Sequence, residues 1–181
     1  MLCGLLLATG ATAAELNRLD VSKRDGRIFV QAELTIEGRR DRVYDALIDF
    51  NSFDKWSQRF KYSSYIEDAP DGRRRARNDI EGCILFFCRT VKRVLVLDID
   101  KPAYLRATAE PELSDVDYGR EEWWLTETEA STDAKEATRI VYEHEVKFGF
   151  WVPPVIGVWA IKRALRRDSL NAAQRLEDMV Y

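Results

Sequence analysis

The chain has 181 residues, of which 46% are hydrophobic and 33% charged, and its 28 basic and 31 acidic side chains give a net charge of −3. A chain of this length fits a single domain. A net negative charge argues against a nucleic-acid-binding protein, because such proteins present a basic surface to the phosphate backbone.

Residues 1–14, MLCGLLLATGATAA, carry no charge and end in small residues. They resemble the hydrophobic core and cleavage site of a secretory signal peptide, although no basic residues precede the apolar run. We therefore expect a signal peptide at 1–14, a lead-in at 15–25 and one domain at 26–181. No other stretch approaches the ~18 consecutive apolar residues that a membrane span needs. The expectation is an exported, periplasmic protein without a stable membrane span, for which transient membrane contact stays open.

Two cysteines, Cys83 and Cys88, remain after residue 14. An even number in an oxidising compartment favours a disulfide. Their spacing argues the other way, because in an unbroken strand the two side chains would lie on opposite faces. A bridge therefore requires a turn or bulge between them, and the sequence leaves the question open. Two cysteines and a single histidine do not supply a metal-ligand set, so we expect neither a metal nor another cofactor.

Apolar and polar residues alternate over 26–38, which predicts a strand with one wet face. The period then changes to that of a helix over 40–50, and a second short helix is predicted at 51–56. Turn signals separate six further strands, which are predicted at 61–68, 73–87, 90–100, 104–110, 120–129 and 138–148. The connections are too short for crossover helices, so the strands form an antiparallel meander.

The chain ends in one long amphipathic helix. Pro153 and Pro154 suit its first turn, because proline fixes the backbone there and lacks only an amide proton that would have no partner. Apolar residues then recur at helical spacing, namely Val158, Ile161, Leu165, Ala172, Leu176 and Met179. The turns at 155–159 are apolar on nearly all sides, which exceeds the need of a helix with one buried face. We expect this part of the helix to close over a cavity.

The run VYDALIDF at 43–50 with Trp56, the run FWVPP at 150–154, and the order of elements together resemble one family. It is the START/Bet v1-like (SRPBCC) superfamily, in its polyketide cyclase and coenzyme Q-binding branch, and the resemblance covers residues 27–180. It implies an α+β helix-grip fold with a seven-stranded curved antiparallel sheet, two short helices after the first strand and a long C-terminal helix. It also implies an apolar cavity between sheet and helix that binds lipids, sterols, quinones or polyketides.

Strand parity indicates which side chains face such a cavity. In the last strand one apolar face carries Ile140, Tyr142, His144, Val146 and Phe148. His144, the only histidine, is either a general base or, without a catalytic role, a core histidine bonded to Tyr142, Glu122 or a backbone carbonyl, or a polar anchor for the head group of a ligand. The second interpretation is favoured, because no nucleophile or orienting carboxylate lies at a recognisable spacing.

The run Glu121 to Trp124 needs a similar decision, since adjacent strand residues face opposite ways. The row Glu121, Trp123 and Leu125 has more apolar content than its alternative, so we expect it to face inward. An inward glutamate beside aromatic rings would have a raised pKa and act as an acid. The favoured alternatives are that it lies at the cavity mouth in contact with water or that it pairs with an arginine such as Arg93 or Arg106.

The sequence therefore predicts a protein that binds a hydrophobic small molecule or lipid and catalyses no covalent reaction; transport of the ligand stays open. The expected ligand contacts are Trp123, Tyr142, His144, Phe148, Trp151, Trp159 and Ile161. The rival interpretation is a cyclase/aromatase-type enzyme that uses His144 or an inward glutamate as acid or base. The oligomeric state does not follow from the sequence.

Overall fold

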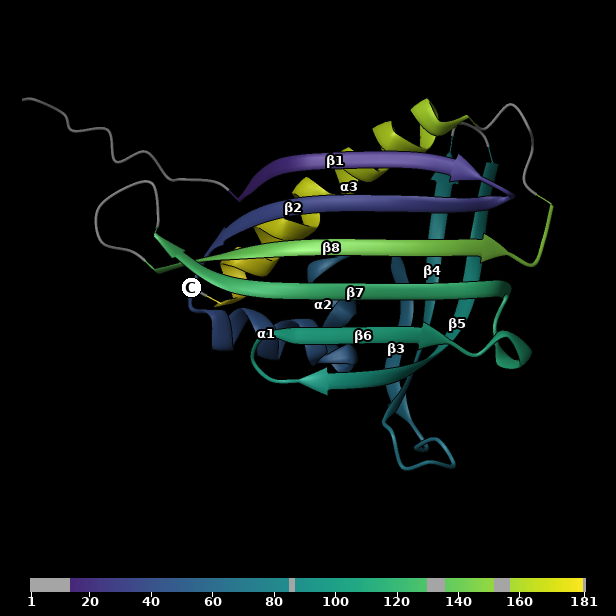
Figure 1. The fold of residues 1–181 in the computed structure, drawn as a ribbon, viewed down its shortest axis with the longest axis horizontal. Coiled ribbons are helices and arrows are strands. Elements are labelled where there is room, and N and C mark those ends of the chain that lie inside the picture. The colour runs from purple at the N-terminus through teal and green to yellow at the C-terminus, as the bar shows by residue number, and fades with distance from the viewer. Residues whose placement is uncertain (1–13, 85–86, 130–135, 152–156, 181) are drawn as a thin grey trace, which may run out of the picture.

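The computed structural model describes residues 14–84, 87–129, 136–151 and 157–180. Within these residues, eight strands form one antiparallel sheet in the order β1-β2-β8-β7-β6-β5-β4-β3 (Figure 1). The strands are β1 (Glu15–Arg24), β2 (Arg27–Glu37), β3 (Phe60–Ile66), β4 (Arg75–Ile84), β5 (Phe87–Asp100), β6 (Tyr104–Ala109), β7 (Val116–Glu129) and β8 (Glu136–Phe148). The helices are α1 (Arg40–Ile48), α2 (Phe53–Trp56) and α3 (Val158–Val180), with short 3-10 turns at Phe50–Ser52 and Pro111–Leu113.

The sheet is strongly curved around α3. In Figure 1, β1, β2, β8, β7 and β6 run side by side, whereas β3 and β4 cross the view at a steep angle, and the long strand β5 bends between the two directions. Helix α3 lies behind the sheet and contacts β1, β2 and β4 as well as α1 and α2. The predicted α+β helix-grip fold is confirmed, since a curved antiparallel sheet holds the C-terminal helix.

The sheet has one strand more than the seven that were predicted, because residues 15–24 form β1 rather than a lead-in. Leu16 and Leu19 have opposite parity, which breaks the alternation expected of a strand. The pairing with β2 shifts register between Leu16 and Arg18, so Leu16 lies opposite Leu34 and Leu19 opposite Ala32 on the same face. An irregularity of this kind adds one residue to a strand and hides its period.

Helix α3 begins later than the prolines suggested. Its described part starts at Val158, after the non-helical Gly157, whose carbonyl accepts the first amide bonds of the helix. Pro153 and Pro154 lie outside the described residues. The predicted apolar stripe is right at Ile161 and Leu176 but wrong at Met179, which is exposed. The buried face is formed by Ala160, Ile161, Ala173, Leu176, Glu177 and Val180.

Helix α1 packs against one end of the sheet through apolar side chains of the segment 43–50. Val43, Tyr44 and Leu47 are its buried residues, and Tyr44 Oη donates a hydrogen bond to the Tyr104 carbonyl at 2.7 Å. Phe50 follows in the short 3-10 turn and is also buried. The apolar positions three and four apart in the sequence therefore point into the core, as their helical spacing predicts.

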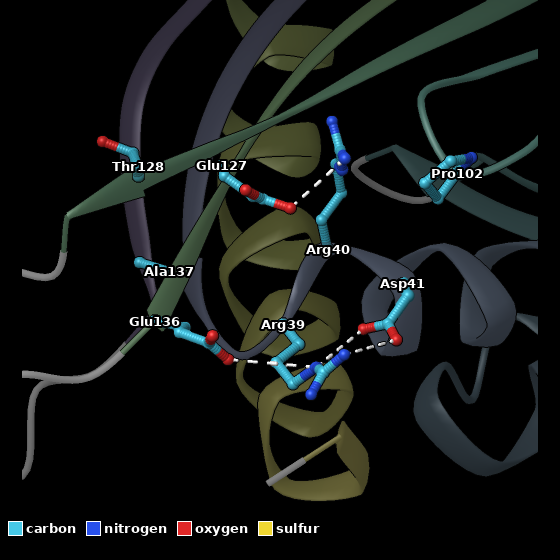
Figure 2. Close-up of a pocket in the computed structure, with 8 residues that line it drawn as sticks. All are labelled: Arg39, Arg40, Asp41, Pro102, Glu127, Thr128, Glu136 and Ala137. Atoms are coloured by element: carbon cyan, nitrogen blue, oxygen red, sulfur yellow. Dashed lines mark hydrogen bonds and ion pairs between the residues drawn. The ribbon is translucent and has the colours of Figure 1, made fainter.

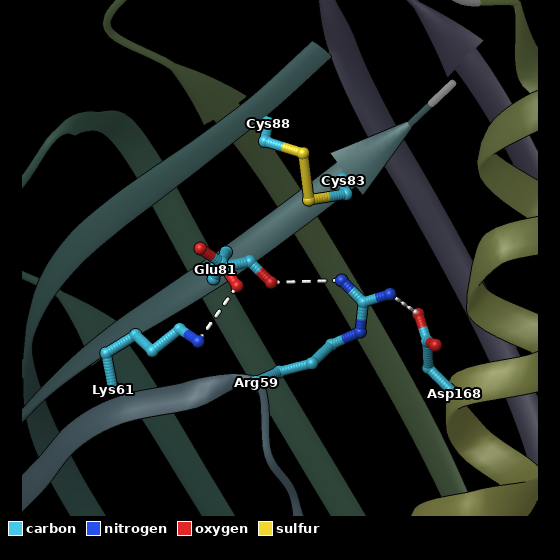
Figure 3. Close-up of a disulfide and its surroundings, with 6 residues drawn as sticks. All are labelled: Arg59, Lys61, Glu81, Cys83, Cys88 and Asp168. Carbon is cyan, nitrogen blue, oxygen red and sulfur yellow. Dashed lines mark hydrogen bonds and ion pairs between the residues drawn. A yellow bond between two sulfur atoms is a disulfide. The ribbon is translucent and has the colours of Figure 1, made fainter. Parts of the chain in front are cut away.

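Cys83 and Cys88 form a disulfide across the β4–β5 hairpin (Figure 3). Their sulfur atoms are 2.17 Å apart, and the two residues pair directly in the antiparallel register. The parity argument against the bridge assumed one unbroken strand. Because β4 and β5 are antiparallel neighbours, in which Ile84 also pairs with Phe87, the two cysteines face each other on adjacent strands.

Candidate ligand-binding site

The inner face of the sheet brings the predicted row of β8 together with one row of β7. Antiparallel pairing sets His144 opposite Glu121 and Tyr142 opposite Trp123, while β2 places Val30 beside His144. Ile140, Leu125 and Val30 on this face are at most 5% exposed, so the face is the core side. The choice of Glu121, Trp123 and Leu125 as the inward row of β7 is thus the one that the structure adopts.

Four polar side chains from four strands form a chain of contacts across this apolar face. Arg93 of β5 donates from Nε to Asn78 Oδ1 of β4 at 3.0 Å and from Nη1 to Glu121 Oε1 of β7. The same Glu121 oxygen lies 3.5 Å from His144 Nε2 of β8. Ala107, the β6 residue paired with Glu121, has a small side chain. We call Asn78, Arg93, Glu121 and His144 the inner polar cluster.

The charges of the inner polar cluster follow from burial and from the Arg93 guanidinium. Burial alone would raise the pKa of Glu121, but the attraction of Arg93 holds it below the usual range, so this carboxylate is ionised. Burial lowers the pKa of His144, which makes the imidazole neutral at pH 7. Burial also raises the pKa of the neighbouring Tyr142 well above 10, so its hydroxyl is protonated.

These charges correct one expectation and support another. The interpretation of an inward glutamate with a raised pKa is wrong, because Glu121 pairs with Arg93, which lowers its pKa. The alternative, a pair with an arginine, is the arrangement present. Glu122 is not a partner of His144, since it lies on the other face, where Arg120 and Arg106 contact it at 2.6 and 3.0 Å. The effect of burial there is outweighed by hydrogen bonds from Arg120, Tyr104 and Arg106, which lower the pKa of Glu122 to about 2.

Two atoms of the inner polar cluster lack a hydrogen-bond partner among the described residues. They are Asn78 Nδ2 and His144 Nε2, and both atoms are inaccessible to bulk solvent. Asn78 is 1% exposed as a residue. Sequence analysis missed it, although its place between Ala76 and Ile80 in the alternation of β4 marks it as an inward polar residue. A buried polar atom without a partner costs about 1–3 kcal/mol, so each one calls for an explanation.

Around the inner polar cluster, aromatic side chains share the core face and are still partly exposed. Trp123, Tyr142 and Phe148 pack against the core without being fully buried. The Trp123 and Tyr142 ring centroids are 5.1 Å apart, and those of Tyr142 and His144 are 6.0 Å apart. The His144 side chain keeps 18% of its surface exposed. Residual exposure on an inward face indicates open space in front of these rings.

Two residues predicted to contact the ligand lie elsewhere. Trp151 is 72% exposed and Trp159 is 68% exposed, so neither belongs to the inner row. The Arg163 guanidinium lies over the Trp159 ring at 5.6 Å. The prediction used the apolar character of the helix start, which does not specify the direction of a single ring. Ile161, by contrast, is 7% exposed and faces the core.

Two surface pockets lie outside the inner row. One, of about 450 Å³, is lined by ion pairs at the ends of β7 and β8, where Arg39 contacts Asp41 at 3.0 Å and Arg40 contacts Glu127 at 3.2 Å (Figure 2). The other, of about 310 Å³, lies beside the disulfide, where Arg59, directly before β3, contacts Asp168 of α3 at 2.6 Å (Figure 3). Both pockets are lined by charged side chains that pair with one another, so we interpret these contacts as structural ion pairs.

The fold matches solved structures, whereas neither a protein-family model nor a curated protein matches the chain. A START superfamily protein from Mycobacterium smegmatis superposes with a TM-score of 0.61 at 14% identity, covering 84% of this chain and 96% of that one. A protein from Thermus thermophilus gives 0.63 at 17% identity, with 84% and 96% covered. The Zhui aromatase/cyclase from a Streptomyces species gives 0.60 at 15% identity, with 85% and 93% covered. The chain therefore has the START/Bet v1-like helix-grip fold.

Proposed function

We propose that the protein binds an apolar small molecule or lipid between the inner face of the sheet and α3. An uncharged polar group of the ligand would lie at Asn78 and His144. The observation that carries the proposal is the pair of buried atoms, Asn78 Nδ2 and His144 Nε2, without hydrogen-bond partners on a partly exposed apolar face. Such atoms favour a partner that comes from outside the protein, because leaving them unpaired is costly.

The charge of the inner polar cluster narrows the ligand class. Arg93 and Glu121 neutralise each other, His144 is neutral through its lowered pKa, and Tyr142 keeps its proton. The cluster as a whole carries no net charge at pH 7. Because burying an unpaired charge is far more costly than burying a hydrogen-bonded polar group, a hydroxyl or carbonyl group fits better than a carboxylate or phosphate.

The apolar part of the ligand supplies the binding free energy. Covering about 200 Å² of apolar surface contributes about 5 kcal/mol, before the entropic cost of association. The aromatic rings of Trp123, Tyr142 and Phe148 provide this surface. Hydrogen bonds at the inner polar cluster then orient the ligand rather than drive its binding.

Native mass spectrometry of the purified protein, followed by organic extraction, tests this proposal. We expect a mass adduct that disappears on extraction and contains an apolar molecule with an uncharged polar end. The variant His144→Phe should lose the adduct or exchange it for a wholly apolar one, whereas the exposed-site control Trp151→Ala should retain it. A protein that is empty from every expression host, and that takes up no added apolar molecule, would overturn the proposal.

A second candidate is a cyclase-type enzyme, and the neutral His144 with an unpaired Nε2 favours it specifically. A neutral imidazole is able to accept a proton from a bound substrate. Glu121 is a poor acid here, since it is ionised and paired with Arg93. Incubation with linear poly-β-ketone substrates should then yield cyclised products with the wild type and none with His144→Gln, while both proteins still bind the substrate. Equal product patterns from both proteins would exclude this role.

We also propose that the protein acts outside the cytoplasm. The uncharged apolar segment 1–14 and the Cys83–Cys88 disulfide support export, because structural disulfides persist in oxidising compartments. Fractionation of a bacterium that expresses the full chain should place the protein in the periplasm, and removing residues 1–13 should retain it in the cytoplasm. Identical distributions of both chains would contradict export.

A further inference from the structure

Ala14, directly before β1, is held by a buried carboxylate of α3. Its backbone nitrogen lies 3.1 Å from Glu177 Oε2. Ala14 is 9% exposed and Glu177 is 5% exposed. The contact joins residues that are 163 positions apart and connects the start of the sheet to the last turn of the C-terminal helix.

Among the described residues, the hydrogen-bond donors that contact Glu177 are neutral. Glu37 N donates to Oε1 at 2.8 Å, and Gln174 Nε2 donates to Oε2 at 3.1 Å. Within the described part of the chain, no basic side chain forms an ion pair with Glu177, and the last turn of α3 contains no basic residue. The nearby Glu37 side chain is a second buried acidic group.

This setting is unfavourable for a carboxylate. The C-terminal end of a helix carries partial negative charge, which repels an anion in the last turn. A buried ion without a counter-ion is costly, and neutral hydrogen bonds compensate for only part of that cost. A positive charge at Ala14 N would complete the site, because that atom is already within hydrogen-bond distance of Oε2.

The sequence offers a way to place that charge. Residues 11–13 read Ala-Thr-Ala, the small-x-small pattern that precedes the bond cut by a signal peptidase. We infer that an export peptidase hydrolyses the Ala13–Ala14 peptide bond, and that the new α-ammonium group of Ala14 forms a buried ion pair with Glu177. Water adds to the Ala13 carbonyl carbon, the C–N bond breaks, and the released Ala14 amine takes up a proton. The inference rests on the proposed export and moves the boundary one residue from the 1–14 segment expected from sequence.

The first test is the N-terminal residue. The full 181-residue chain is expressed in a bacterium with a secretory pathway, and the periplasmic protein is analysed by Edman sequencing and intact mass. We expect a chain that begins at Ala14. Export without cleavage, or a chain that begins at Glu15, would overturn the inference while leaving export itself intact; a chain confined to the cytoplasm would refute export as well.

The second test is the ion pair, measured as a coupling between the α-amino group and Glu177. Chains that begin at Ala14 are prepared with a free or an acetylated amine, each with and without Glu177→Gln. We expect acetylation to lower the ratio of folded to unfolded protein about tenfold in the wild type and less than about twofold in Glu177→Gln, because hydrogen bonds to charged groups are the stronger ones.

The exposed neighbour Glu15 provides the matched control. Acetylation should lower the ratio of folded to unfolded protein by the same factor in Glu15→Gln as in the wild type. An equal loss of stability on acetylation in the wild type and in Glu177→Gln would refute the ion pair. If Glu177→Gln fails to fold, the effect of acetylation on the wild type still decides: no loss of stability would also refute the pair.

Discussion

The pair formed by Arg93 and Glu121 gives the sharpest prediction about how the inner face is held together. Their side chains are 10% and 8% exposed, so Arg93→Met would leave a buried carboxylate without its counter-ion. Breaking a buried ion pair from one side costs about 3–5 kcal/mol. We expect the free energy of unfolding at pH 7, measured by urea denaturation, to fall by that amount.

The pH dependence of this loss identifies its cause. In the wild type the pKa of Glu121 is lowered from 4.5, so its contribution is present above pH 4.5 and disappears only as the pH falls through the lower folded-state pKa. Without Arg93, burial raises the folded-state pKa above the unfolded one, and the variant gains stability relative to the wild type on acidification. The difference should shrink by up to about 1.4 kcal/mol per pH unit between pH 7 and pH 5.

Two further variants separate the charge effect from lost packing. The double variant Arg93→Met with Glu121→Met should recover most of the stability at pH 7, because it removes the unpaired charge. The control Lys101→Met breaks an exposed pair with Asp45 and should cost less than about 1 kcal/mol. A loss for Arg93→Met that is constant from pH 7 to pH 5, or a double variant as unstable as the single one, would refute the electrostatic argument.

Three other predictions concern the site and the fold. His144→Phe should weaken binding of an uncharged polar ligand about tenfold in a fluorescence titration, through one lost hydrogen bond, and an unchanged affinity would contradict its role. Leu176→Ala should lower the free energy of unfolding by about 2–5 kcal/mol, since Leu176 is 3% exposed, whereas the exposed Trp159→Ala should change it by less than about 0.5 kcal/mol; similar losses would contradict the placement of the two side chains. Reducing the Cys83–Cys88 bridge should cost about 2 kcal/mol in urea denaturation, because the closed loop is short; a loss above about 4 kcal/mol would show that the hairpin itself depends on the bridge.

Periodicity was sufficient to predict most of the fold. Strands β2 and β8 and the helix around Tyr44 each bury one face. A single buried face produces a regular pattern of apolar residues in the sequence, so these elements were predicted. Strand β1 was not predicted, because its irregular register puts Leu16 and Leu19 on one face despite their opposite parity. A single shift of register is enough to hide a strand from a period-two pattern.

For the site, strand alternation predicted which residues of a strand face inward, but not which residues of other strands they contact. Parity gave Glu121 and His144 as inward residues, and Arg93 was one of two arginines considered as a partner for the glutamate. Asn78 was not predicted, because its contact with Arg93 depends on how strands pair rather than on a local pattern. The direction of the Trp159 ring likewise depends on where α3 begins, which is at Val158. Sequence reasoning therefore identified the face of the site but not the inner polar cluster that crosses it.

A crystal structure of the protein with 1-decanol tests whether the inner face binds an apolar ligand with an uncharged polar end, since this probe combines an apolar chain with a hydroxyl group. We expect the decyl chain between the inner aromatic rings and α3, with the hydroxyl within hydrogen-bond distance of Asn78 Nδ2 or His144 Nε2. Decanoate, with the same chain and a charged end, should bind at least about tenfold more weakly at pH 7. Decanol bound only at the exposed Trp151 or Trp159, with the inner face closed by side chains, would contradict ligand binding at the inner face.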